Sequence, residues 1–199
     1  IASTPSQTMV EMGRMMSSLA HQIRTPLSAA MLYASHLATR ELTPQQTARF
    51  SQKILARLNN LEQQVKDMLL FVRGDVALSD VITTNVLLQE IQQAAEVTIK
   101  AHGARFTIDN FASEEKFICN LPILVGAIMN LINNSLQATS KNTRITLACS
   151  CEDKRIFIRV TDNGPGMDAV TLEKIQDAFF TSKPQGTGLG LAVVRAVAN

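Results

Sequence analysis

Two long apolar seams joined by a short loop constrain the fold of this 199-residue chain more than any other feature. The first predicts one helix over residues 8–39, and the second begins at the capping pair Thr43-Pro44. Apolar residues recur in both at spacings of three and four: Met9, Met12, Met16, Leu19, Ile23, Leu27, then Phe50, Ile54, Leu58, Leu61, Val65, Met68 and Val72. Joined by residues 40–42, the helices form an antiparallel hairpin. A hairpin cannot bury both seams alone, so we expect a dimeric four-helix bundle.

Pro26 interrupts the first helical pattern. Proline removes a helical hydrogen bond and clashes with the preceding turn, so we expect a kink just after His21. The alternative is that the helix ends there, but continued apolar periodicity argues against it: Leu27, Ala30, Ala34 and Leu37. With Leu19 at heptad position d and Ile23 at a, His21 falls at f, the position furthest from the partner helix. We therefore expect an exposed imidazole.

Composition excludes several classes of protein. The net charge of +2 favours neither nucleic acid nor an anionic membrane. We see no apolar run near the roughly 20 residues of a membrane span and no signal peptide. Because the chain begins with Ile1, we expect a fragment.

The three cysteines favour a reducing, cytoplasmic compartment, in which the full-length protein is either soluble or membrane-tethered. Cys149 and Cys151 share one face of a predicted strand and are badly placed for a disulfide. They also lack the partners of a zinc site, so we interpret all three cysteines as packing residues.

A linker over residues 75–80 separates the hairpin (1–74) from a second domain (81–199). In this domain the sequence predicts both helices and strands. The predicted elements are a helix over 87–101, strands over 104–108 and 116–119, a helix over 122–139, and strands over 143–151 and 155–162. This mixture predicts an α+β layer domain.

Two asparagines lie on the helix predicted over 122–139. Asn130 and Asn134 are four residues apart on one face, and Gln137 lies near that face. The buried side is supplied by Val125, Ile128, Leu131, Ile132 and Leu136. The amides are either a solvated polar face or neutral oxygen ligands for the Mg²⁺ that accompanies ATP.

Two glycine motifs follow the last predicted strand. The first, Asp162-Asn163-Gly164-Pro165-Gly166, offers an acceptor for an exocyclic amine and backbone that a planar ring can approach. The second, Gly186-Thr187-Gly188-Leu189-Gly190-Leu191, opens the final helix as a phosphate cradle does. It also matches dinucleotide fingerprints, but those follow the first strand of a βαβ unit.

Together these motifs resemble the sensor histidine kinases of two-component signalling over nearly the whole chain. The matching segments are the H box (21–27), N box (130–138), G1 box (162–166), an F-like segment (179–183) and the G2 box (186–191). The last two are similar to the nitrogen-regulation and flagellar-regulation branch. The resemblance implies an α/β-sandwich ATP-binding domain of the Bergerat type after the dimeric hairpin. Relatives continue beyond the last helix with further strands that complete the sheet, so we expect this sequence to stop before them.

The resemblance also implies an activity. His21 would accept the phosphoryl group of ATP and pass it to an aspartate of a response regulator. Relatives carry an acidic residue at the position of Gln22, so we expect slower autophosphorylation here. In relatives, a residue at the position of Thr25 positions water for dephosphorylating the regulator; the alternative is an ordinary turn residue before proline.

The resemblance assigns the nucleotide to the second domain. Asn134 would ligate Mg²⁺ with Asn130 near the phosphates, and Asp162 would bind the adenine amine beside Gly164 and Gly166. Residues 167–185 would form a lid anchored by two phenylalanines, whose lysine either reaches a phosphate or is solvated. The remaining implied nucleotide-binding residues are Gln137, Phe180, Lys183, Gly186, Thr187, Gly188, Leu189 and Gly190.

Two other functions stay open. ATP-hydrolysing proteins with the same nucleotide fold place a glutamate four residues before the metal-binding asparagine, where this chain has Asn130, and an amide is no general base. The second alternative is a degenerate kinase that acts as a dimeric scaffold, favoured by Gln22 and the short C-terminus. A scaffold need not bind ATP, so nucleotide binding separates it from a kinase.

Overall fold

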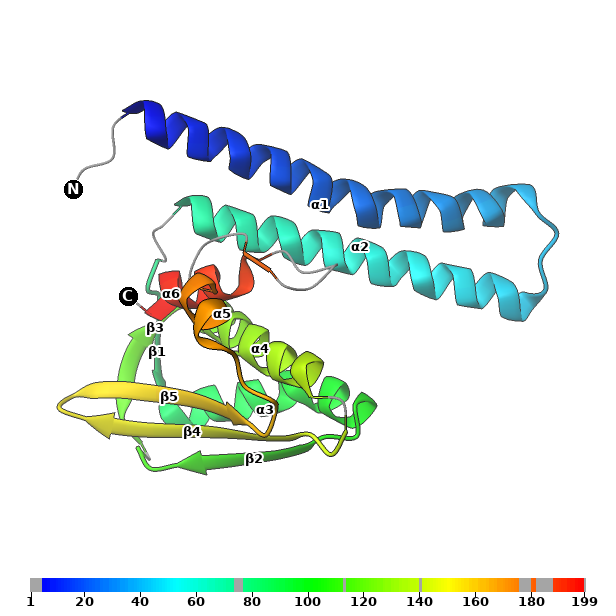
Figure 1. The fold of residues 1–199 in the computed structure, drawn as a ribbon. Coiled ribbons are helices and arrows are strands. Elements are labelled where there is room, and N and C mark those ends of the chain that lie inside the picture. Colours follow the sequence, from blue (N-terminus) through cyan, green and yellow to red (C-terminus); the bar gives the residue numbers. More distant parts are fainter. Residues whose placement is uncertain are drawn as a thin grey trace. The chain divides into compact units, whose positions relative to one another are not determined.

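The computed structural model describes residues 5–73, 77–112, 114–139, 141–175, 180–181 and 188–198, with side chains except those of 5–19 and 71–73. Its elements are α1 (Pro5–Thr39), α2 (Pro44–Arg73), β1 (Asp80–Thr83), α3 (Thr84–Ala101), β2 (Arg105–Asn110), β3 (Lys116–Cys119), α4 (Leu121–Ala138), β4 (Arg144–Glu152), β5 (Arg155–Asp162), α5 (Ala169–Lys174) and α6 (Gly190–Ala198) (Figure 1). They divide into two compact units, one containing the α1–α2 hairpin and the other the strands with α3 to α6.

The hairpin has the predicted boundaries to within a few residues. Helix α1 continues through Pro26, whose side chain is buried, so the alternative that the helix ends there is wrong. Thr43 begins α2 through a reciprocal capping box: its Oγ1 accepts from the Gln46 N–H at 3.2 Å, and Gln46 Oε1 accepts from the Thr43 N–H at 3.0 Å. The seam side chains outside the described part are Met9, Met12, Met16, Leu19 and Val72.

Aromatic stacking joins the two helices of the hairpin near their loop. The Phe50 ring lies 5.8 Å from that of Tyr33 and 5.5 Å from that of His36, and Lys53 Nζ lies 5.0 Å above the Tyr33 ring. Elsewhere the hairpin leaves large apolar side chains exposed: Leu27, Met31, Leu32, Leu55, Leu58, Val65 and Leu69. A single hairpin therefore buries only part of its apolar surface, as the seam pattern predicts.

The second unit contains two small sheets. In the larger one β4 lies centrally, parallel to β2 and antiparallel to β5. The smaller one pairs β1 with β3 in antiparallel register, with Val81 opposite Ile118. The pattern predicted β3 and β5 with their observed bounds and α3, α4, β2 and β4 to within a few residues, but it missed β1 and the short helix α5.

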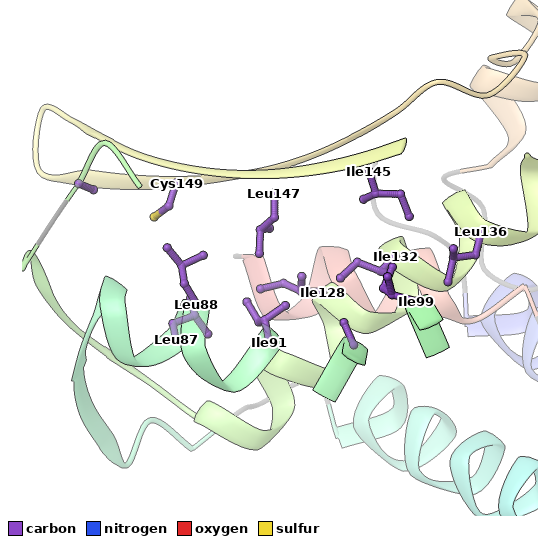
Figure 2. Packing of buried hydrophobic residues seen from close by; sticks show 12 residues of the cluster. Leu87, Leu88, Ile91, Ile99, Ile128, Ile132, Leu136, Ile145, Leu147 and Cys149 are labelled. Atoms are coloured by element: carbon purple, nitrogen blue, oxygen red, sulfur yellow. The ribbon is translucent and has the colours of Figure 1, made fainter. Parts of the chain in front are cut away.

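Helices α3 and α4 cover one face of the larger sheet and enclose the core with it. Figure 2 shows Ile145 and Leu147 of β4 directed towards Ile91 of α3 and Ile132 of α4, and all four side chains are fully buried. On α4, Ile128, Ile132 and Leu136 are buried as predicted, whereas Val125 and Leu131 are half-buried. The core accounts for the apolar periodicity of both helices.

The cysteines pack as expected. Cys119 and Cys149 are buried, Cys151 is half-buried against the same core, and all three are free thiols. Burial raises the pKa of the Cys119 and Cys149 thiols, which lowers their reactivity at neutral pH.

Among the described residues, helix α4 is long and apolar enough to pass a length-and-composition test for a membrane span. This corrects the expectation that no segment approaches such a length. A core helix of a soluble protein passes the same test, so the result is weak evidence for a membrane span. Because α4 packs against α3 and α6, the fold itself explains its apolar side chains.

Candidate functional site

Helix α4 carries three predicted site residues, Asn130, Asn134 and Gln137, and is fixed at its N-terminus by three side-chain contacts. Asn120 Oδ1 accepts from the Ile123 N–H at 3.3 Å, and Asn120 Nδ2 donates to the Ala77 carbonyl at 3.2 Å. The Leu121 N–H donates to Asp80 Oδ2 at 2.8 Å. The first turn of α4 is thereby tied to the segment that leads into β1, which sets the position of its polar face.

Asp162, at the end of β5, has a carboxylate held at both oxygens. Its Oδ2 accepts from Ser135 Oγ at 2.7 Å, and its Oδ1 accepts from the Gly164 N–H at 2.8 Å. The residue is nevertheless exposed. Each oxygen keeps acceptor capacity, so the carboxylate is oriented and still open to a donor from solution.

Close approach explains the glycine at position 164. A Cβ there would lie 2.8 Å from Asp162 Oδ1 and 3.1 Å from Thr139 Oγ1. Gly166 has φ +74° and Gly188 has φ +65°, backbone conformations that L side chains rarely adopt. The structure thus gives a steric reason for Gly164 and a conformational reason for the other two.

Asn163 ties this glycine loop to the start of β4, a contact that the sequence did not reveal. Its Oδ1 accepts from the Arg144 N–H at 2.7 Å, and its Nδ2 donates to the Asn142 carbonyl at 3.1 Å. An asparagine followed by glycine predicts a turn. It does not predict which backbone groups the asparagine side chain binds. Asn163 therefore anchors the loop that carries Asp162 and Gly164.

The other end of the α4 polar face holds a buried donor that lacks a partner. Asn130 Nδ2 is buried and has no hydrogen-bond partner among the described residues. A Cβ on Gly190, the first residue of α6, would lie 3.6 Å from Asn130 Cγ, so the two elements adjoin here. Buried polar groups are normally paired, so this amide indicates a place for a ligand acceptor such as a phosphate oxygen.

Asn134 and Gln137 lie farther along the same helix. Asn134 is half-buried and Gln137 is exposed, and both have polar or electrostatic partners. Asn130 precedes Ser135 by five residues, or about 7.5 Å of helix rise. The orphaned amide of Asn130 and the Asp162 carboxylate held by Ser135 thus lie at different heights along α4 and on different sides of it. This donor and this acceptor fit a nucleotide, and the amide oxygen of Asn134 fits Mg²⁺.

The hairpin carries the predicted phosphoacceptor. His21 is exposed on α1, as heptad position f predicts, and Gln22 beside it is half-buried. One turn on, the exposed Thr25 donates from Oγ1 to the His21 carbonyl at 3.3 Å. This bond restrains the hydroxyl close to the helix backbone.

Part of the predicted site lies outside the described residues. Phe179, Lys183, Gly186 and Thr187 belong there, with most of the lid. Within the described part, Phe180 is half-buried and Leu189 is buried. No group of three or more histidine, cysteine, aspartate or glutamate side chains in that part is arranged to hold a metal ion.

Two family models match the chain. Residues 11–76 match the His Kinase A (phospho-acceptor) domain, and residues 120–199 match the histidine kinase-, DNA gyrase B- and HSP90-like ATPase family. The Pseudomonas aeruginosa sensor protein kinase FleS is 44% identical over 176 residues, which are 88% of this chain and 43% of FleS.

Solved structures share the fold. The Acinetobacter baumannii histidine kinase AdeS has a TM-score of 0.69 at 17% identity, over 89% of this chain and 85% of AdeS. The histidine kinase ThkA, solved in complex with the response regulator protein TrrA, has a TM-score of 0.68 at 21% identity, over 89% of this chain and 53% of ThkA. The chain spans less than half the length of the curated relatives it matches.

Proposed function

Because this chain belongs to the sensor histidine kinases and contains their ATP-binding domain, we propose that it transfers the γ-phosphoryl group of ATP to His21 and then to an aspartate of a response regulator. One observation carries the proposal. The helix that binds the nucleotide presents an amide at Asn130 in place of a general base, while an imidazole lies exposed on the phosphoacceptor module. The nucleotide site is thus poor at activating water, and a nucleophile is available elsewhere.

The two transfers are simple displacements. A lone pair of the His21 imidazole forms a bond to the γ-phosphorus as the bond from that phosphorus to the bridging oxygen of ADP breaks. The imidazole then gives up its N–H proton to solvent. In the second transfer a carboxylate oxygen of the regulator takes the phosphoryl group and the P–N bond breaks. Both require an accessible His21, because two different partners must reach the same nitrogen.

The described residues divide the work of holding ATP. Asp162 accepts the exocyclic amine of adenine, and Gly164 and Gly166 leave room for the ring. Asn130 would donate to a phosphate oxygen, and Asn134 would hold Mg²⁺, which would neutralise phosphate charge. The glycine-rich backbone around Gly188 and Gly190 closes the phosphate end. The resemblance adds Gln137, Phe180 and Leu189 to the proposed set, together with Lys183 and Thr187, which lie outside the described residues.

We propose that the hairpin works as a homodimer. Three of the exposed apolar side chains of α1 and α2, Leu27, Leu58 and Val65, belong to the seams, and a second copy covers this apolar surface most economically. Free thiols among the described residues are compatible with the cytoplasm, where ATP and the regulator are present.

A second activity, dephosphorylation of the regulator, is favoured by Thr25. Its hydroxyl is exposed one turn from His21, where a receiver domain would have to approach to reach the imidazole. A hydroxyl there orients water by a hydrogen bond. The complex that ThkA forms with TrrA supports a receiver domain as partner.

The test incubates the chain with γ-labelled ATP and Mg²⁺ and follows protein-bound label and free phosphate in parallel. A kinase accumulates acid-labile label faster than it releases phosphate, and Asn134→Ala loses the label. Phosphate release without label would instead show an ATP-hydrolysing protein. Absence of nucleotide binding would show a scaffold.

A further inference from the structure

We infer that Ser135 is a positioning residue for nucleobase selection: its hydroxyl fixes the Asp162 carboxylate to accept an exocyclic amine. The inference rests on the proposed function, since it concerns the base end of the same ATP site. It adds a side chain inside the N box (130–138) to which the resemblance assigns no role.

Burial makes the bond from Ser135 to Asp162 informative. Ser135 is only 6% exposed and lies among core residues such as Ile132 and Leu136. A hydroxyl in such a place costs free energy unless it is hydrogen-bonded. Helical serines commonly donate back to a carbonyl of the preceding turn, but this one donates at 2.7 Å to a carboxylate 27 residues away.

The second donor defines the chemistry that Asp162 can offer. The Gly164 N–H donates to Oδ1 while Ser135 donates to Oδ2. A side chain at 162 must therefore accept at both ends, which a carboxylate does and an amide cannot. Held by two donors, an exposed carboxylate that would otherwise sample several rotamers keeps one orientation.

The fixed orientation of the Asp162 carboxylate determines which purine bases the site can bind. The free acceptor capacity of a fixed carboxylate pairs with an amine such as that on C6 of adenine. A 6-oxo purine presents a carbonyl oxygen at the same place and is repelled, and a purine without any substituent leaves the carboxylate unpaired. Sites built to hydrogen-bond a ligand reject analogues that lack the group, because their polar atoms then stay unsatisfied.

The experiment measures binding of three diphosphates to the full chain by calorimetry: ADP, inosine diphosphate and purine riboside diphosphate. Diphosphates avoid phosphoryl transfer, so the result does not depend on His21. We expect wild type to bind ADP at least tenfold more tightly than either analogue. Ser135→Ala is expected to weaken ADP binding about five- to tenfold and purine riboside diphosphate less than twofold.

Ser135→Cys separates hydrogen bonding from packing, because a thiol nearly matches the hydroxyl in size but is a weak donor. If the hydroxyl acts by donating, the Ser135→Cys variant behaves like the alanine variant; wild-type selectivity in the cysteine variant would overturn the inference. Ser150→Ala, at a half-buried position of β4 opposite Phe157, is the matched control and leaves all three affinities unchanged.

Equal weakening of the binding of all three ligands by Ser135→Ala would also overturn the inference. A purely structural role of Ser135 would lower the three affinities by the same factor. These outcomes are distinct from failure of the proposed function. A chain that discriminates bases through Ser135 but never labels His21 contradicts the kinase proposal alone. A wild type that binds no ADP contradicts both.

Discussion

The backbone of Gly164 lies so close to the side chain of Asp162 that a Cβ at position 164 would stand 2.8 Å from Oδ1, the oxygen that the Gly164 N–H itself binds. A methyl group there meets Thr139 Oγ1 on its other side at 3.1 Å. The hydrogen bond from the Gly164 N–H to Oδ1 therefore requires that residue 164 has no side chain. The loop accommodates its carboxylate only because residue 164 is glycine.

Gly164→Ala should displace Asp162 and weaken ADP binding at least tenfold, measured by calorimetry. Gly126→Ala on α4 is the control, because a Cβ there meets nothing within 4 Å. Removing a helical glycine should stabilise the chain by about 0.5–1 kcal/mol without changing ADP affinity. Wild-type ADP binding by the Gly164→Ala variant would contradict the account of this loop.

Gln22→Glu should increase the initial rate of autophosphorylation several-fold. A carboxylate beside His21 accepts the proton of the imidazole and makes the attacking nitrogen more basic, whereas an amide only orients the ring. The measurement is the initial rate of label incorporation from γ-labelled ATP, with Gln92→Glu, at an exposed position of α3, as charge control. An initial autophosphorylation rate of Gln22→Glu equal to or below that of wild type would contradict this explanation.

Thr25→Ala should leave autophosphorylation intact and prolong the lifetime of the phosphorylated regulator in the presence of ADP. The variant removes only a hydroxyl that bonds back to the His21 carbonyl, so the imidazole keeps its place. Thr39 makes the same type of bond to the Ser35 carbonyl at 2.7 Å, and Thr39→Ala is the control. An unchanged regulator lifetime would argue that Thr25 is an ordinary helix residue.

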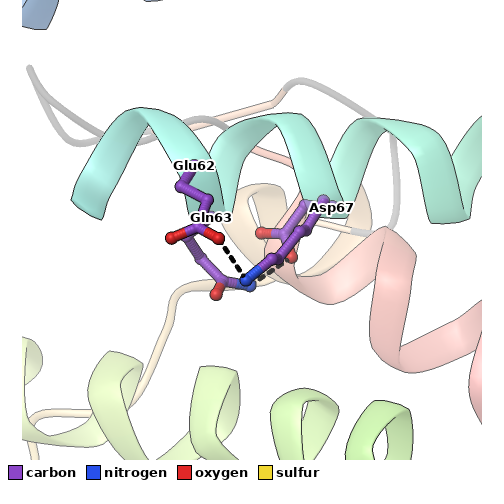
Figure 3. Close-up of polar contacts among 4 residues, drawn as sticks. Glu62, Gln63 and Asp67 are labelled. Atoms are coloured by element: carbon purple, nitrogen blue, oxygen red, sulfur yellow. Dashed lines mark hydrogen bonds and ion pairs between the residues drawn. The ribbon is translucent and has the colours of Figure 1, made fainter. Parts of the chain in front are cut away.

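Asp67 is a carboxyl on α2 that is only 8% exposed, with Gln63 Nε2 donating to its Oδ1 at 2.8 Å (Figure 3). Burial raises its pKa, and the bond from Gln63 opposes that shift. The native state therefore binds this proton more tightly than the unfolded chain. The resulting stability is present at pH values below the unfolded pKa and is lost as pH rises through the native pKa.

Asp67→Asn should accordingly raise the melting temperature at pH 7, by about 2–4 °C for each 1 kcal/mol of relief, and the gain should shrink towards pH 4. Circular dichroism follows the transition. Glu62, in the same view, forms an exposed pair with Lys66 at 2.7 Å, so Glu62→Gln should change little at either pH. A gain that is independent of pH would contradict the burial argument.

The sequence predicted the helices other than the six-residue α5 and most strands, because their signals are local. Seam spacing, the Thr43-Pro44 start and the β-branched runs of β4 and β5 each depend on neighbours within a few residues. Strand β1 was missed because four residues carry little periodicity and its partner, β3, lies more than thirty residues away. The parallel pairing of β2 with β4 across an intervening strand and helix also has no local signature.

In the candidate site, too, some residues could be predicted from the sequence and others could not. Glycines, asparagines and Asp162 could be picked out because their spacing forms motifs. Ser135 and Asn163 lie inside these motifs, but their roles could not be predicted, since each acts through a contact with a segment about twenty or more residues away. Likewise, the orphaned Asn130 amide follows from the packing of α4 rather than from its sequence.

The most direct test asks whether His21 itself carries the phosphoryl group. Wild type and His21→Gln are incubated with γ-labelled ATP and Mg²⁺, and the label is mapped by peptide mass spectrometry and by its acid lability. The account predicts acid-labile label on the peptide that contains His21, and none in His21→Gln, although that variant binds ADP as wild type does. Label on another residue, or an unlabelled wild type that binds ATP, would contradict it.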